Sequence, residues 1–184
     1  INLITRKRGG APATLRAAAY AEHIGRLNTT VTASRQWGRN DVLFTGGRNF
    51  FAGWDPRHTG LVDLSPALAD TNRFQQWKPR EQYFGRFSYR HTTDRWDLGY
   101  KAEGMHDVIL NRGLPRAPYH ESAFDERYTT LRLDHALTAE HRLARGRKLT
   151  GLVAHNRYLR FSNRWFRDLT TLSEQLVDGP SEQD

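Results

Sequence analysis

Histidine and carboxylate side chains, the groups that most often do chemistry in proteins, are present in this sequence but poorly placed for it. The eight histidines are scattered along the chain. His135 and His141 are six residues apart on one expected strand, so they share a face but lie too far apart to bind one ion. The chain has no cysteine, which excludes disulfides and thiolate metal sites. We therefore expect no metal ion.

No motif predicts a catalytic site. The segment 46–49 (G-G-R-N) is too short for a phosphate-binding loop and lacks the lysine of such loops. Glycine inside a strand pattern indicates a bulge or bend, which we expect at Gly46 and Gly47. Asp134 and Glu140 alternate with Arg132, a spacing typical of ion pairs and not of an acid and base pair. We expect no enzyme activity, no catalytic residue and no cofactor.

Basic and aromatic residues alternate in segment 157–167 (R-Y-L-R-F-S-N-R-W-F-R). Such a pattern occurs where single-stranded nucleic acid stacks on a protein. It also occurs in a strand that runs into a loop. We favour the strand and expect no nucleic-acid partner, because no recognised nucleic-acid module accompanies the segment.

Composition limits the class of protein. The net charge is +8 and most of the 28 basic residues are arginines, which indicates either an anion-binding surface or solvated polar surfaces and loops. We favour the second, because the arginines are spread along the whole chain. Mean hydropathy is −0.75, and no apolar run approaches the roughly 20 residues of a membrane helix. A helical membrane protein is excluded, whereas a β-barrel shows lipid only every second residue.

Apolar and polar residues alternate with period two along most of the chain, which predicts an all-β, antiparallel structure. Only segments 65–69 and 168–177 have the pattern of short helices. The seven expected strands are 13–24, 29–37, 42–54, 82–91, 96–111, 129–141 and 149–161.

The joins between these strands alternate in length. Segments 38–41, 92–95 and 143–148 are short, whereas 55–81 and 114–128 are long and irregular. Membrane β-barrels have this connectivity, with tight turns on one side of the bilayer and large loops on the other. Compact soluble domains rarely carry a loop as long as 55–81. The first join on the long-loop side, 25–28, is short and is an exception.

Aromatic residues lie near the expected strand ends, as Trp37, Trp54 and Trp96 do. This placement is typical of the aromatic girdles of membrane barrels, although ordinary core aromatics also occur in strands. The alternative is a soluble binding module, a small β-barrel or sandwich with its apolar face inward. That alternative requires Leu131, Leu133 and Leu137 to point into a closed core.

Several segments resemble TonB-dependent outer-membrane receptors of the Bacteroidetes type, and the resemblance covers nearly the whole chain. The first is similar to the last plug strand of that family, and the next two to external loops. They are 1–7 (I-N-L-I-T-R-K), 71–84 (T-N-R-F-Q-Q-W-K-P-R-E-Q-Y-F), 111–119 (N-R-G-L-P-R-A-P-Y), 123–128 (A-F-D-E-R-Y) and 168–176 (D-L-T-T-L-S-E-Q-L).

The resemblance implies an outer-membrane receptor of about 22 strands with a plugged lumen. Residues 1–10 would then end the plug domain, and 11–184 would form the N-terminal part of a transmembrane β-barrel, an incomplete curved sheet of about seven strands. The implied function is energised uptake of a scarce nutrient such as a metal chelate, cobalamin or oligosaccharide. The implied partners are outer-membrane lipid and lipopolysaccharide, the imported ligand, and TonB through the missing plug region.

The resemblance also gives the sheet a direction, with the short joins in the periplasm and the long joins outside. Arg48, Arg112 and Arg116 would attract an anionic ligand, contact lipopolysaccharide or be solvated, and no substrate-binding residue is assigned. We interpret the chain as a piece of a longer protein. Because both edges of such a sheet are open, we expect that it does not fold in water as a monomer.

Overall fold

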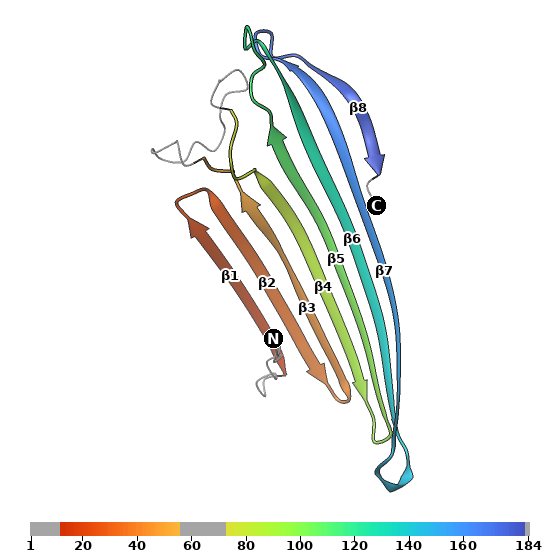
Figure 1. Cartoon of the computed structure of the whole chain (residues 1–184). Coiled ribbons are helices and arrows are strands. Elements are labelled where there is room, and N and C mark those ends of the chain that lie inside the picture. Colours follow the sequence, from red (N-terminus) through yellow and green to blue (C-terminus); the bar gives the residue numbers. More distant parts are fainter. Residues whose placement is uncertain (1–11, 56–72, 183–184) are drawn as a thin grey trace.

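One antiparallel sheet makes up the computed structural model, which describes residues 12–55 and 73–182 (Figure 1). Eight strands lie in chain order, and the sheet is not closed. The strands are β1 (Ala13–Glu22), β2 (Arg26–Trp37), β3 (Asn40–Phe51), β4 (Arg80–Thr92), β5 (Trp96–Arg112), β6 (Ser122–Arg142), β7 (Lys148–Asp168) and β8 (Glu174–Glu182).

The alternation of short and long joins is confirmed. The turns after β2, β4 and β6 lie together at the lower end of the sheet in Figure 1, and the turn after β6 holds one 3-10 turn, Ala144–Gly146. The chain leaves β3 and β5 at the opposite end. The sheet therefore has a short-turn end and a long-loop end.

Eight strands replace the seven expected. The prediction of a short helix over 168–177 is wrong, because β8 occupies Glu174–Glu182 and pairs with β7 through Trp165–Leu176 and Arg167–Glu174. The segment contains a tight turn followed by a strand, and the mixture hides the period of two. The prediction of a long join over 114–128 is also wrong in part, since β6 begins at Ser122.

Some expectations fall on residues that the structure does not describe. The plug segment 1–10, the resemblance of 1–7 and the short helix over 65–69 all lie outside the described residues. So does the middle of the join 55–81. The described ends of that join meet at Trp54 and Trp77, which form an isolated antiparallel bridge.

The sheet has two faces of opposite character, because residues opposite one another on antiparallel strands share a face. We define the apolar face by one row of five residues and the polar face by another. The apolar row is Val42, Tyr89, Tyr100, Leu137 and Val153. The polar row is Thr45, Arg86, Glu103, Asp134 and Asn156.

No second layer covers either face among the described residues. The buried apolar side chains there are Ala52, Ala123 and Leu169, all near the long-loop end. The leucines of the apolar face are exposed: 40% for Leu131, 49% for Leu133 and 54% for Leu137. They do not point into a closed core within the described structure.

The glycine pair of β3 does not form the expected bulge. Gly46 and Gly47 pair in unbroken register with both neighbouring strands. Glycine is needed at position 47 for another reason, since a Cβ atom there would lie 2.2 Å from the Thr29 carbonyl oxygen and 2.9 Å from Cζ of Phe84. The Phe84 ring therefore lies across the bare backbone of Gly47.

Gly47→Ala is expected to lower the free energy of unfolding by about 1–3 kcal/mol, because the Thr29 backbone oxygen cannot move without breaking the ladder. Chemical denaturation in detergent micelles measures the change. Gly85→Ala is the matched control: its Cβ would meet nothing within 4 Å, so its effect stays within about 1 kcal/mol. Equal losses for the two variants would contradict this account of Gly47.

Candidate functional site

Ion pairs and hydrogen bonds link the side chains of the polar face. Arg86 Nε lies 3.5 Å from Glu103 Oε2, and Arg132 Nε lies 2.7 Å from Asp134 Oδ2. Asn156 donates from Nδ2 to Asp134 Oδ1 at 2.8 Å. These charges are partly exposed and paired with one another, so the face is hydrophilic without a large local excess of either sign.

A hollow of about 250 Å³ lies on this face, and we call it the wall hollow. Arg86, Glu103, Arg132 and Asp134 line it, together with the amides of Asn49 and Gln82. Asn49 Nδ2 donates to Gln82 Oε1 at 2.8 Å, which fixes both amides. Such a lining offers donors and acceptors to a polar ligand or segment, but it presents no nucleophile beside a base.

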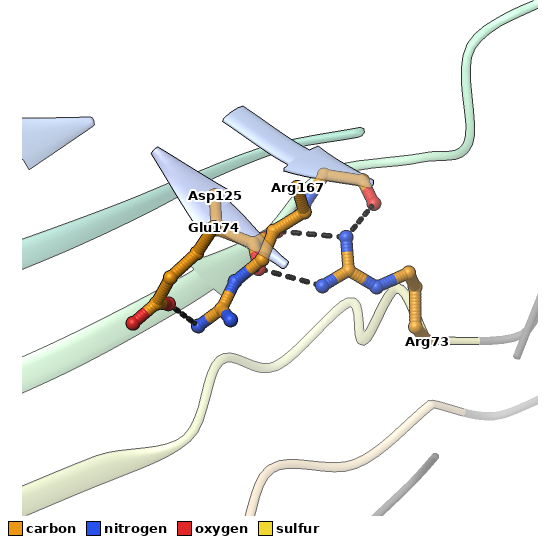
Figure 2. A network of polar contacts seen from close by, with 5 residues as sticks. Arg73, Asp125, Arg167 and Glu174 are labelled. Carbon is orange, nitrogen blue, oxygen red and sulfur yellow. Dashed lines mark hydrogen bonds and ion pairs between the residues drawn. The ribbon is translucent and has the colours of Figure 1, made fainter. Parts of the chain in front are cut away.

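At the long-loop end, four charged residues form a network that Figure 2 shows in close view. Arg73 points from the loop toward Asp125 of β6 and binds it in a bidentate pair, with N–O distances of 2.8 and 2.6 Å. Arg167 of β7 lies 3.4 Å from Asp125 and also pairs with Glu174 of β8. We call these four residues the rim network.

Burial makes the Arg73–Asp125 pair the strongest part of the rim network. Arg73 is fully buried, and Asp125 Oδ1 also accepts a hydrogen bond from the Gly113 amide at 3.2 Å. A bidentate, shielded pair of this kind holds the connection before β4 against β6. A second hollow of about 230 Å³, the rim hollow, lies beside Asp125, Arg167 and Glu174.

Aromatic contacts fix the same end of the sheet. The rings of Trp54 and Trp77 stack with centroids 4.8 Å apart, and their backbones exchange two hydrogen bonds of 2.9 Å. Nζ of Lys78 lies 3.7 Å from the centre of the Phe74 ring. Burial lowers the pKa of Lys78, against the opposing effect of Asp55.

The turn between β7 and β8 is organised by one carboxylate. Asp168 Oδ1 accepts hydrogen bonds from the Thr170 hydroxyl at 2.6 Å, the Thr170 amide at 2.8 Å and the Thr171 amide at 3.0 Å. These bonds stabilise the charged form and lower the pKa of Asp168 from 3.8 to about 2, with the Thr170 hydroxyl as the largest cause.

The residues singled out for chemistry in the sequence have structural partners. His135 Nδ1 lies 2.8 Å from the Tyr100 hydroxyl, and His141 stacks on Trp96 with ring centroids 4.2 Å apart. The prediction that His135 and His141 lie on the same face of one strand is confirmed. The expected ion pairs are also present, since Asp134 pairs with Arg132, and Glu140 pairs with Arg142 and Lys148.

The three arginines considered for ligand attraction differ in their surroundings. Arg48 pairs with Glu81 and lies over the Phe50 ring, and Arg116 lies over the Phe124 ring at 5.0 Å. Arg112 lines the rim hollow.

Sequence reasoning missed the rim network. Arg73 and Asp125 are 52 positions apart in the chain. No local spacing relates two residues so far apart, so no signal in a single sequence could have found the pair.

Among residues 12–55 and 73–182, no group of three or more His, Cys, Asp or Glu side chains is placed to hold a metal ion. No helix in the same residues is long and apolar enough to cross a membrane. Comparisons with family profiles, curated proteins and solved structures return no match for this chain.

Asp125→Ala is expected to lower the free energy of unfolding by about 3–5 kcal/mol, because it leaves the guanidinium of Arg73 buried without its partner. The double variant Arg73→Met/Asp125→Leu should recover much of this loss, since it removes both charges together. Chemical denaturation in detergent micelles compares the variants.

The exposed pair Arg39–Asp94 provides a control for this experiment, since its side chains are 57% and 89% exposed. Asp94→Ala should cost less than about 1 kcal/mol. A double variant at positions 73 and 125 that is no more stable than Asp125→Ala would contradict the role given to the buried charge.

The β7–β8 turn is expected to loosen in acid. Because the pKa of Asp168 is lowered when the protein is folded, the carboxylate stabilises the turn above about pH 4 and loses this effect as the pH falls toward about 2. NMR amide shifts of Thr170 and Thr171 should titrate in that window in the wild type. Asp168→Ala should abolish the titration, and a midpoint near pH 4 in the wild type would refute the hydrogen-bonding account.

Proposed function

We propose that this chain forms part of the barrel wall of a TonB-dependent outer-membrane receptor, which imports a scarce nutrient such as a metal chelate, cobalamin or oligosaccharide. The proposal rests on one observation above all: a single unclosed sheet has an exposed apolar face and a paired, charged face. In an outer-membrane barrel these faces meet lipid and a wet lumen respectively.

The apolar face supports a contact with lipid. Its exposed leucines, valines and aromatic residues extend across the strands from β1 to β7, and soluble monomers rarely leave so large a continuous patch in water. Trp37 ends β2 and Trp96 begins β5, so both lie at the short-turn end, where an interfacial girdle of aromatic residues is expected.

The polar face supports a role as lumen lining. Arg86 pairs with Glu103 across β4 and β5, and Arg132 pairs with Asp134 along β6, which makes the face hydrophilic. The wall hollow beside these pairs offers hydrogen-bonding groups to a polar ligand or polar chain segment. In this proposal the strands are scaffold, and the long-loop end shapes the external entrance.

The rim network supports the assignment of the long-loop end to the outside. It fixes the loop that carries Arg73 against β6, β7 and β8, and so gives the entrance a defined shape. The short-turn end then lies in the periplasm, where TonB acts on the plug of such receptors.

The competing proposal is a soluble binding module with its apolar face turned inward. That module needs a closed core around Leu131, Leu133 and Leu137. Within the described residues the buried apolar side chains are two alanines and one leucine, all near the long-loop end and not around these leucines. This distribution favours the membrane proposal.

A pair of adjacent residues on β6 separates the two proposals. The chain has no cysteine, so Leu137→Cys and Thr138→Cys each place one spin label on one face. In the full chain reconstituted in bilayers, the spin label at Leu137→Cys should be relaxed more by molecular oxygen than by a water-soluble nickel chelate, because oxygen concentrates in lipid. Relaxation by a water-soluble nickel chelate should dominate for Thr138→Cys.

The reverse pattern, or a Leu137→Cys label that neither reagent reaches, would support the soluble module instead. Ala136→Cys is a second control, because it shares the polar face with position 138 and should behave like it.

A further inference from the structure

Three glycines leave a bare strip on the apolar face. Gly46, Gly85 and Gly104 lie directly opposite one another on β3, β4 and β5. The Phe44 ring covers Gly46, since its Cζ lies 3.1 Å from the place of a Cβ atom there. A Cβ atom at Gly85 would meet nothing within 4 Å. At Gly104 a Cβ atom would lie 3.5 Å from Cδ2 of Leu133, so that side chain borders the strip there. The strip is therefore open at Gly85 and bordered by Leu133 at Gly104.

A hollow of about 510 Å³ lies over this strip, and we call it the glycine hollow. Tyr83, Leu131, Leu133 and Leu159 form its sides on the apolar face. Its width from β4 to β7 is three strand spacings, or about 14 Å, a length that part of an acyl chain can span.

Two arginines line the glycine hollow, and one of them, Arg132, pairs with Asp134 on the polar face. The other is Arg157. Arg157 of β7 lies directly opposite Leu133 and is exposed. Within the described part of the chain, no carboxylate pairs with it, whereas Arg48 on the same face pairs with Glu81. A guanidinium among leucines is costly unless an anion from outside the protein meets it.

The depth of Arg157 indicates where that anion lies. Arg157 is nine residues beyond Lys148, the first residue of β7. With a rise of about 3.3 Å per residue and a tilt of about 40°, it lies about 23 Å above the short-turn end. If the apolar band, which is about 25 Å tall, begins at Lys148, Arg157 lies about 2 Å below its upper edge, within reach of the lipid headgroups on the long-loop side.

We propose that the glycine hollow binds a phosphate-bearing lipid, with an acyl chain over Gly85 and Gly104 and the phosphate hydrogen-bonded by Arg157. The proposal rests on the proposed function, because it needs the apolar face to meet lipid. A guanidinium binds phosphate through two parallel hydrogen bonds, and the apolar sides accept the chain. A lipid with an anionic headgroup carries both the phosphate for Arg157 and the acyl chain for the apolar sides.

The full chain is reconstituted in bilayers that contain phosphatidylglycerol and an uncharged diacyl glycolipid with the same acyl chains. Native mass spectrometry of the protein released from these bilayers then compares how much of each lipid stays bound. The wild type should retain phosphatidylglycerol about tenfold more than the glycolipid, the effect of one charge-assisted contact. Arg157→Gln should remove this preference. Gly85→Leu fills the hollow and should lower the retention of both lipids.

Arg127→Gln is the matched control, because Arg127 is an exposed arginine of the apolar face that does not line the hollow. It should keep the preference. An unchanged preference in Arg157→Gln, or an equal loss in Arg127→Gln, would overturn the proposal. Displacement of the lipid by glycerol phosphate alone would also overturn it, since the acyl chain would then contribute nothing.

The label at Leu137→Cys distinguishes failure of this proposal from failure of the proposed function. If that label meets lipid and Arg157→Gln keeps the preference, only the lipid site is wrong. If the label is shielded from lipid, the membrane function and the lipid site both fail. Circular dichroism of each variant confirms that the sheet has formed.

Discussion

Hydrogen bonds between neighbouring strands hold this structure together, because the described residues enclose almost no apolar core. The ladder runs in unbroken register from β1 to β7, and register shifts occur only between β7 and β8. A shift of one residue would move every side chain to the other face. The register therefore decides the character of both faces and the position of each glycine, ion pair and hollow.

The long-loop end depends on a different kind of interaction. There the strand pairing ends, and contacts between buried side chains position the irregular chain. The Arg73–Asp125 pair and the stacked rings of Trp54 and Trp77 attach the chain before β4 to the strands. Buried polar contacts of this kind specify one arrangement because any other leaves a charge without a partner.

The proposed function and the proposed lipid site both follow from the separation of the two faces. On the polar face, Arg86 pairs with Glu103, and Arg132 with Asp134. Arg157 lies on the apolar face beside the three glycines. No carboxylate of the described residues pairs with its guanidinium, so an anion from the surroundings can bind there. Arg157 differs from Arg127, another exposed arginine of the apolar face, because it lines the glycine hollow.

The sequence by itself determined the elements of this protein, and the tertiary structure decided how distant residues meet. Period two is a local property, so alternation and turn residues predicted seven of the strands, both faces and the alternating joins. β8 was not predicted, because its short period-two pattern follows directly on a tight turn. Only the folded register placed Phe84 on Gly47, Arg73 on Asp125 and Arg157 beside the glycines, because these contacts join positions that local spacing cannot relate.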